Sequence, residues 1–137
     1  FIDMLPGFIQ NMVWSLWASG KKHFTIHQYD QVWQQIVDNS TSLALNEFPG
    51  AFVDWDNTAR YGKRATIFSG ASPQHFKYWF RKLVESVSDK PDEMNYIFLN
   101  AWNEWAESAY IEPDEKYGYA YLEAIREVVS ADAPGNV

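Results

Sequence analysis

The stretch Asn95–Glu107 constrains the fold more than any other part of this sequence. It opens with a short apolar run, Tyr96 to Leu99, which is rich in aromatic and β-branched residues and predicts a strand buried on both faces. The sequence then turns polar and presents two carboxylates, Glu104 and Glu107, close to Trp105. Because α/β enzymes place their chemistry where buried parallel strands end, this stretch is the candidate active site.

A second unit of the same kind precedes it. Ala51–Val53 predicts another short strand, which ends in the polar cluster Asp54–Asn57. Ser72-Pro73 is a strong helix start, and the apolar residues that follow keep helical spacing as far as Val87. Strands that alternate with helices, each strand ending in a polar cluster, indicate an α/β fold with parallel strands, as in a (β/α) barrel or an open sheet.

The remaining segments follow from their apolar spacing and from their Gly, Pro and polar residues. We predict a helix over 6–20, an extended or loop segment over 23–29, a helix from Tyr29 to Ser40, a polar and basic loop over 58–66, a loop over 108–116, a last helix from about Gly118 to Val129, and a frayed tail over 131–137.

Charge and composition exclude several classes of partner. The net charge is −7 and no basic cluster is longer than Lys21-Lys22, so we expect no nucleic-acid partner. There is no cysteine, hence no disulfide framework and no cysteine-based zinc site. No apolar run approaches the roughly 20 residues that span a bilayer, so we expect no transmembrane segment. His23 and His27 lie on a segment with little helical character, and we expect no metal and no cofactor.

Aromatic residues make up 18% of the chain, including seven tryptophans. They predict either a large aromatic core or rings that line a groove for a flat ligand, and the two are compatible. Two glutamates between aromatic rings suit a sugar, because rings cover its apolar face while carboxylates act as acid, base or nucleophile. Asp54-x-Asp56 offers a competing interpretation, as a divalent-ion site for a nucleotide-sugar, although two aspartates at this spacing also arise by chance.

Longer motifs then carry a resemblance. Asn100–Glu107, Glu112–Tyr119, Trp55–Arg60 and Ser72-Pro73 resemble the C-terminal part of the WbsX-type proteins of bacterial surface-polysaccharide clusters, which are described as glycosyltransferases. That family is in turn similar to glycoside hydrolase family 99, whose members are endo-α-mannosidases. The resemblance implies the C-terminal portion of a (β/α)₈ TIM-type barrel and a polysaccharide or oligosaccharide substrate, from lipopolysaccharide O-antigen or capsule biosynthesis.

Glu104-Trp105-Ala106-Glu107 matches the Glu-Trp-x-Glu segment of those hydrolases. The resemblance implies that Glu104 is the base at the substrate's 2-hydroxyl and that Glu107 is the general acid/base at the glycosidic oxygen. The chain departs from the pattern at Ala106, where the hydrolases have His, and at Ser108, where Gly is usual. It also has Asp54 where the WbsX-type proteins usually have Gly.

The motifs also define the expected substrate-binding residues, and we expect the two motif clusters to meet at one edge of the sheet. These residues are Trp55, Asp56, Asn57, Arg60, Trp102, Asn103, Trp105, Tyr110 and Glu112.

A complete barrel takes about 250 residues, so residues 1–137 are expected to form one incomplete barrel domain. The chain begins at Phe1, and we expect its true start to be missing. Either a homo-oligomer or an absent N-terminal barrel half is expected to complete the barrel. We expect a cytoplasmic location and leave membrane association open.

Three functions remain open on the sequence. The first is an enzyme that cleaves or transfers glycosidic bonds with Glu104 and Glu107. The second is a nucleotide-sugar-dependent glycosyltransferase, and the third is a non-catalytic sugar-binding module.

Overall fold

The structure is a computed structural model that describes residues 24–91 and 94–131. The helix predicted over 6–20, His23 and the tail 132–137 lie outside the described residues. The chain forms, in order, β1 (Thr25–Gln28), α2 (Tyr29–Ser40), β2 (Gly50–Phe52), α3 (Thr58–Tyr61), β3 (Thr66–Ser69), α4 (Pro73–Val87), β4 (Phe98–Asn100), β5 (Asn103–Glu104), β6 (Ala109–Tyr110) and α5 (Ala120–Ala131).

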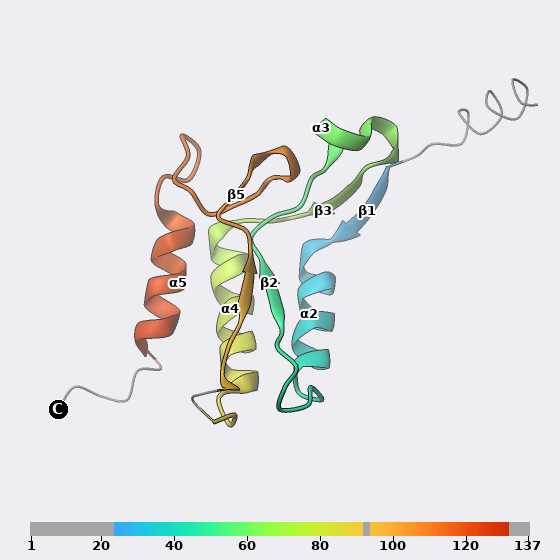
Figure 1. Cartoon of the computed structure of the whole chain (residues 1–137). Helices are drawn as coiled ribbons and strands as arrows, with labels where there is room; N and C mark the ends of the chain where they lie inside the picture. The colour runs from blue at the N-terminus through green and yellow to red at the C-terminus, as the bar shows by residue number, and fades with distance from the viewer. Residues whose placement is uncertain (1–23, 92–93, 132–137) are drawn as a thin grey trace, which may run out of the picture.

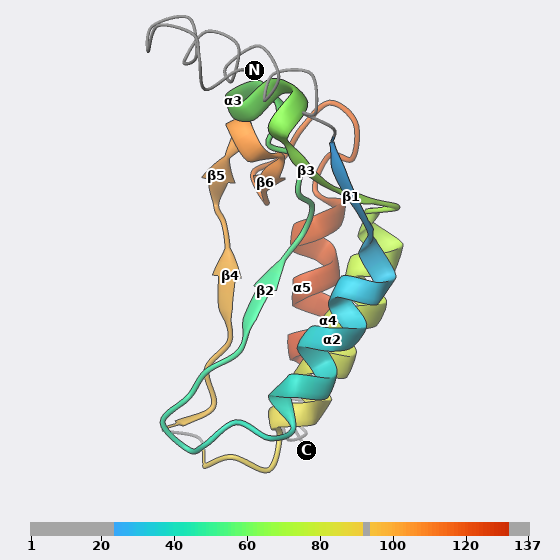
Figure 2. The same cartoon turned by 90° about the vertical axis from the view of Figure 1, so that its right-hand side faces the viewer.

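Two layers make up the body of the molecule. Strands β2 and β4 form one layer, and helices α2, α4 and α5 form the other, with α4 packed between its two neighbours (Figures 1 and 2). β2 and β4 are parallel, with Gly50 opposite Phe98 and Phe52 opposite Asn100. β1 and β3 form a second parallel pair, and β5 and β6 form a short antiparallel hairpin. The predicted α/β class with parallel strands and helices is therefore confirmed.

Helix α4 forms where its capping signals and its apolar spacing predict it. The Ser72 hydroxyl accepts a hydrogen bond of 3.2 Å from the backbone N–H of His75, and Pro73 occupies the first helical position, where its missing N–H costs nothing. One face of the helix is buried against the other elements, through Phe76, Trp79, Phe80, Leu83 and Val87. Burying each large apolar side chain contributes about 1.5–3 kcal/mol, so this face anchors the helix layer.

Aromatic rings fill the space between the two layers. Trp33 of α2 is fully buried and stacks on Phe52 of β2, with ring centroids 5.2 Å apart, and Phe76 of α4 meets it edge-on. The Tyr29 hydroxyl donates a hydrogen bond of 3.0 Å to the carbonyl oxygen of Val53, which satisfies a buried polar group. The predicted aromatic core is thus present, and it joins α2 and α4 to β2.

Strand β4 differs from its prediction. It runs from Phe98 to Asn100 rather than from Tyr96 to Leu99, and it is not buried on both faces: Phe98 is 65% exposed and Tyr96 is also exposed. The helix layer covers only one face of the β2–β4 pair, as the edge-on view shows (Figure 2). An apolar run predicts a strand that is covered on both faces. It does not show whether residues 24–91 and 94–131 themselves supply the cover for both faces.

Several loop predictions were also wrong in detail. The segment 58–66 holds α3 and a 3₁₀ turn at Gly62–Arg64, and its last residue begins β3, which the sequence did not predict. The segment 108–116 contains β6, and the last helix runs from Ala120 to Ala131, so Ala131, which was predicted to begin the tail, is helical. Such short elements form through contacts with distant segments, and local spacing carries little signal for them.

Candidate functional site

The polar clusters that follow β2 and β4 lie at the same end of the molecule. The parallel register sets the carboxyl ends of the two strands side by side, so the chain that leaves each of them starts from the same edge. Figure 2 shows α3, β5 and β6 gathered at this end, beyond the strand layer. A hydrogen bond of 2.9 Å from the backbone N–H of Asp56 to the carbonyl oxygen of Glu107 joins the two clusters directly.

Arg60 contacts both candidate catalytic carboxylates. One guanidinium nitrogen lies 2.9 Å from Oε2 of Glu104, and the other lies 3.4 Å from Oε1 of Glu107. The Glu104 and Arg60 side chains are about half exposed, whereas only 15% of the Glu107 side chain is exposed. Solvent screens the Arg60–Glu104 pair, so we read these contacts as positioning rather than as a large source of stability. The two glutamates therefore converge on one cation, and one of them is largely enclosed.

The loop that carries Arg60 is held by side-chain to backbone hydrogen bonds. Asn57 is 8% exposed, and its side-chain oxygen accepts a bond of 2.8 Å from the backbone N–H of Thr66. Its carbonyl oxygen accepts the backbone N–H of Arg60, at 3.1 Å. Asp56 Oδ1 accepts the backbone N–H of Thr58, at 2.9 Å. Asp56 and Asn57, both predicted to bind substrate, hold these local bonds, which set the position of Arg60.

A hairpin carries the two glutamates. Glu104 ends β5 opposite Ala109 of β6, and a 3₁₀ turn at Trp105–Glu107 connects the two strands. Ser108 closes this turn in the left-handed conformation, with φ of 56°. Glycine adopts that conformation at no steric cost, so Ser108 holds a backbone conformation that suits glycine better than serine. The turn aims Glu104 and Glu107 toward the same cation.

Trp105 and Tyr110 form an aromatic platform beside the carboxylates. Their rings stack with centroids 3.8 Å apart and planes 14° from parallel. The indole N–H of Trp105 donates to a Glu112 carboxylate oxygen at 2.6 Å, and the Tyr110 hydroxyl donates to Asp114 at 3.0 Å. Burial, together with the hydrogen bond to Asp114, raises the pKa of Tyr110 to about 12. The polar atoms of the platform are therefore bonded to carboxylates, while half of Trp105 remains exposed.

Trp102 and Asn103, also predicted to bind substrate, point away from the core. Trp102 is exposed, and its carbonyl oxygen accepts the backbone N–H groups of Ile111 and Glu112, both at 3.1 Å. Asn103 lies opposite Tyr110 in the hairpin and is exposed as well. Both side chains are accessible to a ligand.

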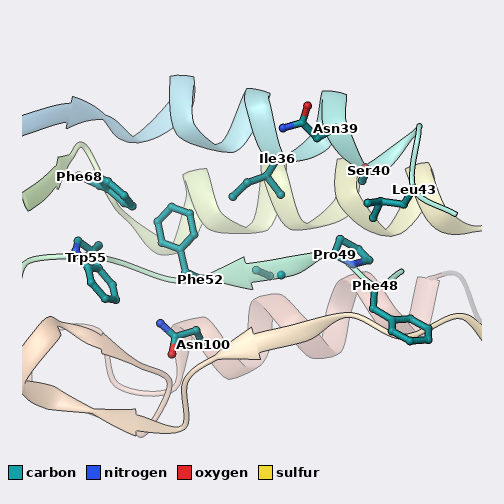
Figure 3. Close-up of a pocket in the computed structure, with 12 residues that line it drawn as sticks. Ile36, Asn39, Ser40, Leu43, Phe48, Pro49, Phe52, Trp55, Phe68 and Asn100 are labelled. Carbon is teal, nitrogen blue, oxygen red and sulfur yellow. The ribbon is translucent and has the colours of Figure 1, made fainter. Parts of the chain in front are cut away.

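Trp55 lies in a different setting. Its ring is 6.3 Å from that of Phe68, and both rings line an open apolar groove of about 590 Å³ that runs along β2 (Figure 3). The described residues that line this groove carry no charge; they are Ile36, Asn39, Ser40, Leu43, Phe48, Pro49, Gly50, Ala51, Phe52, Trp55, Phe68 and Asn100. This groove lacks acid/base groups, and the carboxylates lie beyond its lining.

The aspartates of the Asp-x-Asp pattern are turned toward the backbone. Asp54 Oδ1 accepts the backbone N–H of Trp55 at 2.7 Å, and Asp56 accepts that of Thr58. Burial raises the pKa of Asp54 above its ordinary value, and the hydrogen bond from Trp55 offsets part of this effect.

His27 lies on β1, where its ring meets Phe68 edge-on. Over residues 24–91 and 94–131, no three His, Cys, Asp or Glu side chains gather closely enough to hold a metal ion.

None of the helices in the described ranges has the length and apolar character that a bilayer span demands.

Comparison with known proteins identifies the family. Residues 8–125 match the family described as Glycosyltransferase WbsX, and the chain belongs to this family. An uncharacterized protein named WxcX from Xanthomonas campestris pv. campestris strain B100 is 33% identical over 102 residues, and WxcX of strain ATCC 33913 matches to the same extent. The match covers 72% of this chain but only 15% of the length of each relative. No solved structure matches.

Proposed function

We propose that this domain acts on the glycosidic bonds of a polysaccharide through Glu104 and Glu107. The observation that carries the proposal is the double contact of Arg60, which gathers both carboxylates at the edge where β2 and β4 end. Two acid/base groups beside exposed aromatic rings fit a sugar ring, whose faces are apolar and whose rim is hydroxylated. The name of the family, that of a glycosyltransferase, supports the same class of substrate.

The likeness to the family 99 hydrolases supports a role for each carboxylate. Glu104 takes the proton of the substrate's 2-hydroxyl, whose oxygen then attacks the anomeric carbon and forms a 1,2-anhydro ring. Glu107 gives a proton to the glycosidic oxygen that departs. Glu107 next takes a proton from the water or hydroxyl acceptor that opens the ring, while Glu104 returns its proton to the 2-oxygen. A water acceptor gives hydrolysis, and a sugar hydroxyl acceptor gives transfer. Glu104 and Glu107 play the same roles in both reactions.

Arg60 holds the two carboxylates until a sugar arrives. To deliver a proton, Glu107 must leave its contact with the Arg60 guanidinium, and at 3.4 Å this contact is the longer of the two. A sugar hydroxyl that accepts a hydrogen bond from Arg60 offers the guanidinium another partner. We therefore expect substrate binding to separate Arg60 from Glu107 and to leave Glu107 free to act.

The parallel strand pairs support a finer proposal for the architecture. They fit the last units of a (β/α)₈ barrel, in which the exposed face of β4 around Phe98 would be the inner face. Strands from a second copy of the chain or from an N-terminal barrel half would cover it. Sedimentation should then show self-association of the isolated chain, and a compact, stable monomer at high concentration would count against this architecture.

One observation favours a second candidate, a transferase that uses a nucleotide-sugar. Arg60, Lys63 and Arg64 lie on α3 and the turn that follows it, and all three are exposed. Exposed cations next to the carboxylates could bind the diphosphate of an activated sugar. A measurement distinguishes the two candidates, because turnover by this transferase requires a nucleotide-sugar and turnover by the first candidate does not.

The test is turnover of a labelled surface polysaccharide, with and without nucleotide-sugar, by the wild type, Glu104→Gln and Glu107→Gln. Gln keeps the size of Glu but cannot exchange the proton, and a general acid or base contributes about 10²–10⁴-fold to the rate. We expect each variant to lose most turnover while it keeps the fold. A substrate whose leaving group needs no protonation should partly rescue Glu107→Gln and should not rescue Glu104→Gln.

Glu123→Gln is the matched control, because Glu123 is an exposed carboxylate in the first turn of α5, outside the site. It should turn over like the wild type. If Glu104→Gln and Glu107→Gln keep near-normal rates on a substrate that the wild type converts, the proposed roles fail. Turnover only with nucleotide-sugar selects the transferase. Binding of the polysaccharide without turnover under either condition selects a sugar-binding module.

A further inference from the structure

A second groove lies next to the aromatic platform, on the side of the hairpin that leads to α5. It is open, has a volume of about 660 Å³, and is lined by Trp105, Tyr110, Pro113, Asp114, Lys116 and Tyr119, among others. We call it the platform groove. Trp105, which lines the platform groove, lies between Glu104 and Glu107 in the chain, so the groove and the carboxylate pair share the Trp105–Glu107 turn. Neither Lys116 nor Tyr119 belongs to the site described above.

Hydrogen bonds within the chain shape the platform groove. Asp114 accepts the Tyr110 hydroxyl and the backbone N–H of Tyr117, and its carbonyl oxygen accepts the N–H of Gly118 at 3.0 Å. Gly118 has φ of 55°, a conformation that favours glycine and closes the turn. The stacked pair and this turn are held by contacts within the protein, and lining residues fixed in this way lower the entropic cost of binding.

The rings in the platform groove face solvent. Tyr119 is 64% exposed and Trp105 is 50% exposed, although both are large aromatic residues that folding usually buries in part. The polar atom of Trp105 is bonded to Glu112, so the surface that Trp105 offers to a ligand is the flat ring. Exposed rings beside carboxylates and a lysine form the kind of surface that takes a sugar, with apolar contact from the faces and hydrogen bonds at the rim.

The charge of the side chains around the platform groove indicates which class of sugar the groove can bind. Asp114 and Glu115 line the platform groove against a single cation, Lys116, whose ammonium group sits 4.4 Å from the centre of the Tyr117 ring. The hydrogen bond from the Tyr117 backbone N–H holds the pKa of Asp114 below its usual value, so this carboxylate is ionised at neutral pH. Glu112 adds a further negative charge beside Trp105. The balance is negative, which disfavours a uronic acid or a phosphorylated sugar.

We propose that the platform groove is a subsite for an uncharged sugar residue, next to the residue that reacts at Glu104 and Glu107. This inference rests on the proposed function, because it takes the substrate to be a polysaccharide that extends past the reacting bond. Tyr119 and Trp105 supply the stacking surfaces, and the carboxylates around them select against acidic units. The proposed specificity concerns the sugar residue next to the cleaved or transferred unit. The carboxylate pair itself does not contact this neighbouring residue.

Binding of defined trisaccharides to the whole chain tests the proposal. We would measure the affinities of maltotriose, cellotriose and α-mannotriose by calorimetry, with trigalacturonic acid as the acidic probe. The wild type should bind at least one neutral trisaccharide and should bind trigalacturonic acid more weakly. Loss of one aromatic contact should weaken neutral binding about tenfold in Tyr119→Ala and in Trp105→Ala. The indole N–H resonance of Trp105, assigned from Trp105→Phe, should shift on binding.

Two further variants sharpen the test. Tyr78→Ala is the matched control, because Tyr78 is an exposed tyrosine on α4 outside the platform groove, and this variant should bind like the wild type. Glu115→Lys makes the groove less negative, so it should improve the binding of trigalacturonic acid and leave neutral binding almost unchanged.

The proposal is overturned if no neutral trisaccharide binds at millimolar concentration, if Tyr119→Ala binds like the wild type, or if the acidic trisaccharide binds best. None of these outcomes tests the proposed function, which is tested separately by the turnover of Glu104→Gln and Glu107→Gln. Conversely, normal turnover by those variants together with loss of binding in Tyr119→Ala would remove the catalytic roles and keep the subsite.

Discussion

Trp33 and Trp105 make similar contacts and lie in very different surroundings. Each stacks on another aromatic ring, Trp33 on Phe52 at 17° and Trp105 on Tyr110 at 14°. Trp33 is sealed between α2, α4 and β2 and has no exposed surface, whereas half of Trp105 is exposed beside the two glutamates. Ring stacking therefore does not distinguish a core residue from a residue of a ligand site, and the surroundings of the pair decide.

The difference divides the aromatic residues of this chain into two groups. Rings between the helix layer and the strand layer meet other rings and aliphatic side chains, so their burial stabilises the fold. On the hairpin, Trp105 and Tyr110 have polar partners at one edge, and Trp105 and Tyr119 are at least half exposed. The predictions below test this division, from the largest expected effect to the smallest.

The largest contrast is expected between the two tryptophans themselves. Trp33→Ala should lower the free energy of unfolding by about 3–5 kcal/mol, because it removes a fully buried ring and leaves a cavity. Trp105→Ala should cost about 1 kcal/mol, the value of a stacked pair at a solvated surface. Urea denaturation of both variants measures the difference. Equal losses would show that the platform is part of the core, and the division would then fail.

A smaller contrast is expected between two asparagines. Asn57→Ala should cost about 1–3 kcal/mol, because it leaves the backbone N–H of Thr66 without its partner in a buried loop. Asn103 is exposed, and Asn103→Ala should change stability by less than about 0.5 kcal/mol. Thermal unfolding measures both. If Asn57→Ala unfolds like the wild type, Asn57 does not hold the Arg60 loop, and its predicted contact with substrate becomes the better explanation of its place in the motif.

At the turn of the hairpin, Ser108→Gly should raise stability by about 0.5–1 kcal/mol. A side chain in the left-handed conformation is strained, and glycine relieves the strain, although it also adds freedom to the unfolded chain. Ser69→Gly is the control, because Ser69 lies in β3, where glycine should destabilise. A loss of stability in Ser108→Gly would show that the serine side chain makes a contact that outweighs the strain.

The smallest effect is expected at Asp54, and it depends on pH. Burial raises the pKa of this carboxyl in the folded chain, so its ionised form opposes folding at neutral pH. Asp54→Asn should therefore be more stable than the wild type at pH 7. The gain should shrink as the pH falls through the raised pKa and should vanish below the ordinary value of 3.8, where Asp54 is protonated in both states. Denaturation midpoints from pH 3 to pH 7 check this, and a gain that does not vary with pH would contradict it.

Residues that act locally allowed the best predictions. The Ser72 cap, Pro73 and the apolar spacing up to Val87 each specify part of α4 through neighbours within a few residues, so the helix could be placed within one residue of its bounds. Helix α2 followed in the same way from Tyr29 and Trp33. The α/β class followed from the order of such elements.

Features that depend on distant partners were predicted less well. Strand β3 has four residues whose pairing with β1 is not visible in either segment, so the sequence placed Thr66 in a loop and did not predict the strand. The exposure of Phe98 depends on what covers β4, which the apolar run itself does not state. At the site, the position of strand ends led us to expect both motifs at one edge. The contact of Arg60 with both glutamates depends on side-chain geometry, and no spacing rule indicates it.

The long separation between Arg60 and Glu104 also has a consequence for the order in which the chain folds. The two residues are 44 positions apart, and they meet only when β2 and β4, with α4 between them in the chain, have come together. The bond between Trp105 and Glu112 spans seven positions and closes a short loop. Short loops close in tens of nanoseconds, whereas distant parallel strands pair slowly. A refolding chain should therefore form the platform early and assemble its carboxylates on Arg60 among its last events.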